Sequence, residues 1–209
     1  RVDRIDTATR EVWPAPPHHG YGYTAGQRFA FLNVLEELDA PGEWYLDAAR
    51  GLLFFWPPDP PGPGETVIPV LRDPLVALDG ADAVVLRNLV LDAGRGSAVR
   101  MRGCSACRIE GCLILNVGRT AVVVEGGERC ELSSCEIRDV GGGGVSLSGG
   151  DRITLAPARH AARGNHIHDF AQRLRTYQPA IAVSGVGQVV AGNLMHDAPH
   201  MAVSIAGND

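Results

Sequence analysis

The sequence predicts an all-β protein in which residues 81–209 form a parallel β-helix, a solenoid of about five stacked coils. A seven-residue pattern, such as RNLVLDA at Arg87 or GCLILNV at Gly111, returns five times in this region. Its Asn or Cys recurs after 24, 23, 30 and 28 residues, a period typical of solenoids. Within each repeat, apolar and polar residues alternate as they do in strands. No stretch is long enough for a helix that covers a sheet, so each coil is expected to pair with the next.

Three columns emerge when the five repeats are aligned. The first, of Asn and Cys, and the second, which is apolar, are expected to face into the coil as stacks of like residues about 4.8 Å apart. The third, of Asp and Asn, is expected to lie in a turn, where these side chains cap backbone N–H groups. In coil order, the columns are Asn88, Cys112, Cys135, Asn165 and Asn193; Val90, Ile114, Ile137, Ile167 and Met195; and Asp92, Asn116, Asp139, Asp169 and Asp197.

The segment before the repeats, residues 1–80, is expected to form a separate N-terminal region. Prolines from Pro14 onward and the GYGY run predict an extended loop. Phe29–Val34, Glu43–Leu46 and Leu52–Trp56 predict three short strands of an antiparallel meander. The first coils carry leucines at positions that are expected to face outward. The meander is therefore expected to pack on these coils and shield their apolar surface.

Composition limits the function classes. The 209 residues carry a net charge of −5, which speaks against a nucleic-acid partner, and they contain no apolar run long enough for a membrane span. The chain begins with Arg1 and ends just after a coil-closing glycine, without the cap that a solenoid end requires. We therefore expect a piece of a longer β-helix, incomplete by itself.

The five cysteines follow the register of the coils. Cys107 and Cys130 share one column, Cys112 and Cys135 share another, and Cys104 lies at a turn. Strand alternation distributes these sulfur atoms around the coil, so buried free thiols are expected in place of a zinc site. No metal site and no cofactor are expected elsewhere, with calcium as the exception if the protein is a lyase.

Two stretches resemble a known group of proteins. They are NVLEELDAPGEWYLDAARGLLFFWPP, with its GEWYLD, and YQPAIAVSGVGQVVAGNLMHDAPHMAVSIAGND, with its HDAPH. Both look like a large group of bacterial secreted right-handed parallel β-helix proteins of the pectate-lyase-like superfamily, and this group resembles β-helical glycoside hydrolases of the fucosidase and xylanase types. The resemblance implies a right-handed helix, a secreted or periplasmic location, and a plant or microbial polysaccharide or glycoside as substrate. It also implies acidic catalytic residues in coils beyond Asp209.

An insertion after the fourth repeat is expected to wall a substrate groove. It spans residues 171–179 and carries Arg173, Arg175 and Tyr177, which suit hydrogen bonds to sugar hydroxyls or carboxylates and stacking on a pyranose face. A second insertion, residues 155–163, is expected on the same side of the solenoid. The predicted substrate-binding residues are Arg173, Arg175, Tyr177, Asp169 and Asp209.

Histidines beside this insertion are the candidate catalytic residues. His168 and His196 follow the buried positions of adjacent repeats, and they are expected to point outward with backbones roughly 5 Å apart. Histidine titrates near neutrality and an adjacent carboxylate tunes it, which predicts a proton-transfer or substrate-orienting cluster. His166 is outward as well, but it shares its column with Glu136 and Leu194 and is expected to be an ordinary surface residue. The predicted catalytic residues are His168, His196, Asp197 and His200.

Three functions stay open from the sequence. A glycoside hydrolase, which the resemblance favours, would use two carboxylates that flank the scissile bond. A polysaccharide lyase would need a uronate substrate, a base such as His, Arg or Tyr, and often calcium, although the sequence has no calcium-loop aspartate cluster. A non-catalytic β-helix would bind glycan or form a stalk. The expected partner in each case is a polysaccharide or oligosaccharide.

Overall fold

The computed structural model describes residues 2–18, 20–60, 62 and 66–207. The chain divides into two units, Arg1–Glu65 and Thr66–Asp209. The second unit is the solenoid, and it carries every candidate site residue that the structure describes.

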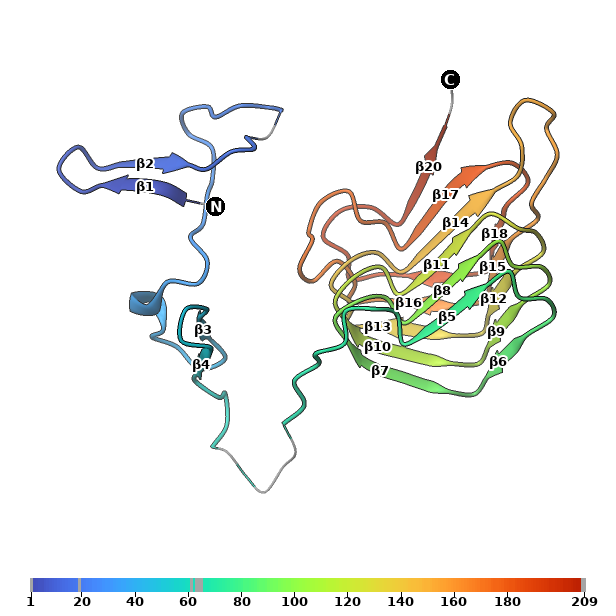
Figure 1. Ribbon diagram of the computed structural model, residues 1–209, viewed down its shortest axis with the longest axis horizontal. Helices are drawn as coiled ribbons and strands as arrows, with labels where there is room; N and C mark the ends of the chain where they lie inside the picture. The colour runs from blue at the N-terminus through green and yellow to red at the C-terminus, as the bar shows by residue number, and fades with distance from the viewer. Residues whose placement is uncertain (1, 19, 61, 63–65, 208–209) are drawn as a thin grey trace. The chain divides into compact units, whose positions relative to one another are not determined.

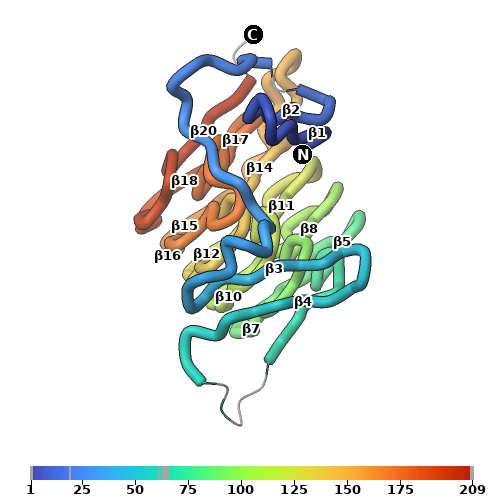
Figure 2. Tube along the Cα trace, turned by 90° about the vertical axis from the view of Figure 1, so that its left-hand side faces the viewer, coloured from blue at the N-terminus to red at the C-terminus, as the bar shows by residue number. Residues whose placement is uncertain are grey.

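The solenoid is built from three parallel sheets, which confirms the predicted all-β fold (Figure 1). Each sheet takes one strand per coil, so its neighbouring strands come from successive coils (Figure 2). The first sheet contains β5 (Val76–Asp79), β8 (Val99–Arg102), β11 (Val122–Glu125), β14 (Val145–Gly149), β17 (Ile181–Gly185) and β20 (Val203–Ala206). The second contains β6 (Val85–Arg87), β9 (Arg108–Glu110), β12 (Glu131–Ser133), β15 (Ala161–Arg163) and β18 (Val189–Ala191). The third contains β7 (Val90–Gly94), β10 (Leu113–Val117), β13 (Glu136–Arg138), β16 (His166–Ile167) and β19 (Leu194–Met195).

The apolar column of the third sheet is confirmed in four coils and wrong in the first. Four predicted members belong to the core or pack against it: Ile114, Ile137, Ile167 and Met195. In the first coil Leu91, not Val90, pairs with Ile114. Val90 is 65% exposed, whereas Leu91 is 9% exposed. The alignment of the first repeat is thus one residue out of register, and because side chains alternate along a strand, a one-residue shift reverses the face.

Two left-handed backbone positions in each coil explain the Gly, Asn and Asp residues of the repeat. One precedes each strand of the third sheet, and the other lies near the end of the strand or just after it. At both positions φ is between 48° and 64°, where Gly, Asn and Asp are tolerated best. The first position holds Asn88, Gly111, Ser134, Gly164 and Gly192, and the second holds Ala93, Asn116, Asp139, Asp169 and Asp197. Asn88 therefore belongs with the glycines and not with the inward Asn/Cys column, and Ala93 takes the place predicted for Asp92.

The inward Asn/Cys column forms a ladder of hydrogen bonds between coils. Cys135 Sγ accepts a hydrogen bond from Cys112 N at 3.4 Å. Asn165 Oδ1 accepts one from Cys135 N at 3.0 Å, and Asn193 Oδ1 accepts one from Asn165 N at 2.9 Å. Each side chain therefore satisfies a backbone N–H of the preceding coil, which would otherwise be buried without a partner.

All five cysteines are buried free thiols, as predicted. Burial is the main cause that raises the pKa of Cys130 and of Cys135 to about 11. At neutral pH both groups are therefore protonated, and a thiol is a much weaker nucleophile than a thiolate.

We expect the native protein to react with a thiol reagent such as DTNB far more slowly than the unfolded chain. In denaturant all five thiols become accessible and regain an ordinary pKa near 8.5, so they should react within the mixing time of a manual assay. The absorbance of the released thiolate measures both rates. Rapid reaction of one or more thiols in the native protein would contradict this picture of the core.

The N-terminal unit contains two antiparallel hairpins in place of the predicted three-stranded meander. β3 (Trp44–Asp47) pairs with β4 (Leu52–Phe55) as expected, and β1 (Val2–Asp6) pairs with β2 (Glu11–Pro14), which the sequence did not predict. The predicted strand at residues 29–34 is wrong.

Side-chain hydrogen bonds explain both differences in this unit. Asn33 binds the backbone N–H of Leu46 at 2.7 Å and its C=O at 3.0 Å, so a single side chain holds the 29–34 segment, which then runs into the 3-10 helix η1 (Leu35–Glu37). Asp6 and Asp47 each accept two backbone N–H groups in the turns of the hairpins. Both hairpins therefore have an aspartate that binds the N–H groups two and three residues later, and Asp6 was the residue of the sequence that could have indicated the first hairpin.

Candidate functional site

Basic side chains pair with aspartates along one corner of the solenoid, where the chain leaves β13, β16 and β19. In three successive coils a basic residue precedes the left-handed Asp, and the pairs are Arg138–Asp139, His168–Asp169 and His196–Asp197. His168 Nδ1 lies 2.8 Å from Asp169 Oδ2. His196 Nδ1 lies 2.7 Å from Asp197 Oδ2. These carboxylates thus bind neighbouring side chains, whereas the sequence predicted that they would cap the backbone of the turn.

Three imidazole rings form a cluster on this corner, which we call the histidine edge: His166, His168 and His196. The rings of His168 and His196 are stacked, with centroids 5.0 Å apart and planes inclined by 7°. His166 Nε2 lies 2.7 Å from His196 Nε2, and the ring centroids of His166 and His168 are 4.3 Å apart. His166 therefore belongs to the cluster and is not the ordinary surface residue that the sequence predicted. The signal was present, because residues i and i+2 of a strand share a face.

The hydrogen-bond partners fix the protons of the cluster. An ionised carboxylate only accepts hydrogen bonds, so Nδ1 of His168 and of His196 carries the proton, and in the neutral ring Nε2 holds the lone pair. At a separation of 2.7 Å, His166 Nε2–H then donates to His196 Nε2. The result is a directed chain from His166 through His196 to Asp197.

Glu136 is a further member of this corner that the sequence assigned no role. It lies on the outward face of β13, where it pairs with His166 of the next coil. Its Oε1 is 3.6 Å from His168 Nε2 and 3.2 Å from Arg138 Nε. The cluster is therefore surrounded by four carboxylates and one guanidinium: Glu136, Asp139, Asp169, Asp197 and Arg138.

The insertion at residues 171–179 lies against the same corner. Its backbone is held by the glycine turn of the preceding coil: the N–H of Ala171 donates to Gly142 O at 2.7 Å, and the N–H groups of Arg173 and Leu174 donate to Gly141 O at 3.1 and 2.8 Å. Glycine is required at Gly142, because a Cβ there would lie 2.8 Å from the backbone of the coil before it. Arg173 is exposed.

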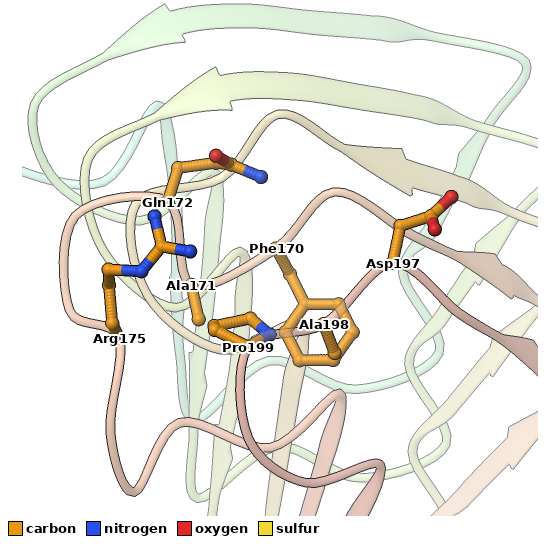
Figure 3. A pocket seen from close by; sticks show the side chains of 7 residues that line it. All are labelled: Phe170, Ala171, Gln172, Arg175, Asp197, Ala198 and Pro199. Atoms are coloured by element: carbon orange, nitrogen blue, oxygen red, sulfur yellow. The ribbon is translucent and has the colours of Figure 1, made fainter.

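A hollow of about 240 Å³ connects the insertion to the histidine edge. Figure 3 shows Phe170, Ala198 and Pro199 between Arg175 on one side and Asp197 on the other. Asp197 both lines this hollow and binds His196 Nδ1, so a ligand in the hollow would contact the carboxylate of this pair, while the lining itself includes none of the three imidazoles. Of the predicted substrate-binding residues, Arg175 has the clearest place in a cavity.

Tyr177 and His200 form a second contact between the insertion and the last coil. Their rings lie edge to face with centroids 5.3 Å apart, and Tyr177 N donates to His200 Nδ1 at 3.4 Å. The Tyr177 side chain is 67% exposed, which leaves ring surface open to a ligand. The predicted Asp209 lies outside the described residues.

The insertion at residues 155–163 does not wall the same groove. It follows β14 and includes β15 (Ala161–Arg163), whereas residues 171–179 lie between β16 and β17, at another corner of the coil. Its second half returns to the core: His160 is fully buried, and its Nδ1 accepts a hydrogen bond from Cys130 N at 3.2 Å. Burial lowers the pKa of His160, so this histidine is a neutral structural residue.

Comparison with known proteins agrees with the architecture. A family model described as a right-handed β-helix region matches residues 97–208, more than half of the chain. No curated protein and no solved structure matches the chain. In the part of the chain that the structure describes, no helix has the length and apolar character needed to cross a bilayer.

Proposed function

The chain belongs to the right-handed β-helix family, and from this premise we propose that it acts on a polysaccharide or oligosaccharide bound across the coils at the histidine edge. One observation carries the proposal. Asp197 joins the hollow lined by Arg175 to the imidazole cluster, so groups suited to binding a sugar lie next to groups suited to proton transfer. A secreted or periplasmic location is part of the same proposal.

The residues beside the hollow have the chemistry of a carbohydrate site. A guanidinium such as that of Arg175 offers several N–H donors in a plane, which fit sugar hydroxyls or a uronate carboxylate. Tyr177 adds an exposed aromatic ring that can stack on the apolar face of a pyranose. Pockets of this kind combine an apolar floor with a few convergent polar groups, and here Ala198 and Pro199 form the exposed apolar part, with the buried Phe170 beneath it.

Glycoside hydrolysis is the first reaction we propose for this site. It requires an acid that protonates the leaving oxygen and a base or nucleophile on the other side of the sugar, both usually carboxylates. In this proposal the histidine edge orients the sugar and moves a proton, because each His–Asp pair directs a basic Nε2 away from its aspartate. At least one catalytic carboxylate would come from coils outside the described residues.

A uronate lyase is the second candidate, and it is favoured by Arg175 in a hollow whose opposite side is Asp197, the hydrogen-bond partner of His196. In β-elimination a base takes the proton at C5 and the C4–O bond breaks. The leaving oxygen takes up a proton from water or from the protonated base, which gives a C4–C5 double bond on one fragment and a hydroxyl on the other. An imidazole Nε2 of the histidine edge would take the proton. Arg175, with calcium as a possible addition, would neutralise the substrate carboxylate.

We expect Arg175→Ala and Tyr177→Ala to weaken glycan binding by the full-length protein about tenfold each, since each loses one hydrogen-bonding or stacking contact. His168→Ala and His196→Ala should lower kcat about 100-fold or more, as expected for loss of proton transfer. Calorimetry and turnover on a panel of neutral and uronate polysaccharides measure both effects. Melting temperatures should stay near that of the parent, because these side chains contribute little to the core.

A control and the product analysis complete this experiment. Arg163→Ala, an exposed arginine of β15 on another sheet, should leave binding and turnover unchanged. New reducing ends without the ultraviolet absorbance of an unsaturated product would identify hydrolysis, and their appearance with that absorbance would identify a lyase. The proposal is wrong if the four site variants bind and turn over every glycan as the parent does.

A further inference from the structure

We propose that His166, His168 and His196 bind one divalent transition-metal ion, and that zinc is the ion this ligand set fits best. One ring nitrogen of each histidine lies within 4.8 Å of the other two. Imidazole is a preferred ligand of zinc, and three protein ligands with an open fourth position are typical of its reactive sites. The sequence predicted no metal site, and it assigned His166 to the ordinary surface, apart from the other two histidines.

The aspartates beside the cluster favour this use of the rings. A histidine that binds a metal usually donates its other N–H to a carboxylate, which fixes the tautomer and makes the ligating nitrogen more basic. His168 and His196 both have this arrangement, with Nδ1 at 2.8 Å from Asp169 and at 2.7 Å from Asp197. Their Nε2 atoms are therefore the available ligands.

Glu136 provides a second and independent indication of a cation. His168 Nε2 and Glu136 Oε1 lie 3.6 Å apart, and with a neutral His168 both atoms are acceptors, although the Glu136 oxygen also pairs with Arg138 Nε at 3.2 Å. Two ligands of a tetrahedral zinc ion, each about 2.1 Å from the metal, are separated by about 3.4 Å. A metal ion between the two atoms would satisfy both, with Glu136 as a fourth ligand or as the partner of a bound water.

The hydrogen bond between His166 and His196 is compatible with metal binding after a small movement. Their Nε2 atoms are 2.7 Å apart, so they must separate by about 0.7 Å to reach the ligand spacing of a tetrahedral site. The His196 side chain is 41% exposed, which leaves room for a shift of this size while Nδ1 stays bound to Asp197. The ion would replace the proton that His166 now donates, since a ligating imidazole nitrogen carries no hydrogen.

The backbone and the charges of this corner also suit a cation. His166 lies in β16, and His168 and His196 come directly after β16 and β19, where their backbone N–H groups bind Ile137 O and Ile167 O of the neighbouring coils, so backbone hydrogen bonds hold the positions of all three rings. Arg138 is paired with Glu136 and Asp139, and Arg173 and Arg175 of the insertion bring two more guanidinium groups to this corner, against four carboxylates. The carboxylates of the corner therefore exceed its fixed positive charge, which favours a divalent ion.

This inference does not depend on the proposed substrate, but it would change the chemistry of the site. A bound ion would occupy the Nε2 lone pairs that the proposed proton transfer uses. Zinc lowers the pKa of a bound water to about 7, so that water would replace the imidazoles as the proton acceptor next to the hollow.

Calorimetric titration of the metal-free full-length protein with zinc, without any glycan, tests the site directly. We expect one ion bound by the solenoid, and at least 100-fold weaker binding after His166→Ala, His168→Ala or His196→Ala. Asp197→Asn, which removes the charge behind His196, should weaken binding about 10- to 100-fold. Cobalt in place of zinc should give the visible absorption of a nitrogen-bound tetrahedral ion, and each histidine variant should lose it.

His200→Ala is the matched control, because it removes an imidazole of the same unit that lies outside the cluster, and it should bind zinc as the parent does. Thermal melting of every variant checks that the fold is intact. The site is refuted if the parent binds no zinc at micromolar concentration, or if the three histidine variants bind it as tightly as the parent. Zinc binding without any glycan activity would overturn only the proposed function, and glycan activity without zinc binding would overturn only the metal site.

Discussion

Ile137→Asp is expected to unfold the solenoid at ordinary temperatures. Ile137 is fully buried and lies between Ile114 and Ile167 in the apolar stack of the third sheet. The substitution removes apolar contacts on both sides and brings a carboxylate into a core that offers it no cation. We expect a loss of about 5 kcal/mol or more in the free energy of unfolding, comparable to the whole stability of many domains. Circular dichroism during thermal and urea unfolding measures this loss.

Val90→Asp is the matched control for this prediction. The repeat pattern places both residues in the same inward column, but the structure exposes 65% of Val90. We expect a change within about 0.5 kcal/mol, as for other surface substitutions. If Val90→Asp destabilised the protein as much as Ile137→Asp, the register of the first coil described above would be incorrect.

Asn165→Ala is expected to cost about 3 kcal/mol. Asn165 is 1% exposed, and its Oδ1 accepts the backbone N–H of Cys135. Its Nδ2 donates to Leu132 O at 3.1 Å and to Asn193 Oδ1 at 2.8 Å. Alanine would leave the Cys135 N–H buried without a partner and would remove the bond to the Leu132 carbonyl. Equilibrium unfolding in urea gives the loss of stability directly.

Asn165→Cys separates the hydrogen bond from the size of the side chain. In the preceding coil a thiol already occupies the equivalent position of the ladder, because Cys135 Sγ accepts a hydrogen bond from the N–H of Cys112 at 3.4 Å. A cysteine at position 165 should therefore recover part of the stability and cost about 1–2 kcal/mol. Equal losses for Ala and Cys would show that the ladder between coils contributes nothing to stability.

The histidine edge arises from a structural column of the repeat. The backbone needs a left-handed residue after β13, β16 and β19, and aspartate meets this need in three successive coils. The carboxylate of each of these aspartates pairs with the basic side chain of the residue before it, which is arginine in one coil and histidine in the next two. A turn requirement of the fold thus supplies the carboxylates that orient the imidazoles of the proposed site.

The sequence by itself determined the solenoid, its period, four of the five core residues in the third sheet, and the outward direction of His168 and His196. It could do so because a strand alternates its faces with a period of two, and because stacked coils bring like positions together. The register of the first coil was predicted incorrectly. Asn88 suits either the left-handed position that is glycine in three other coils or the inward Asn/Cys column. Only the strand pairing of Val90 with Leu113 decided between them.

Tertiary structure decided how the outward residues meet. Spacing placed His166, Glu136 and Leu194 in one column, but ring orientation brought His166 Nε2 to His196 Nε2 on the next coil. The sequence predicted both insertions on the same side of the solenoid. In the structure, residues 161–163 of one insertion form β15, and the other insertion lies beside Asp197. Strand alternation assigns a face to each residue, whereas side-chain torsions and loop closure determine which neighbours on that face make contact. The candidate site is composed of such contacts, so its geometry became visible only in three dimensions.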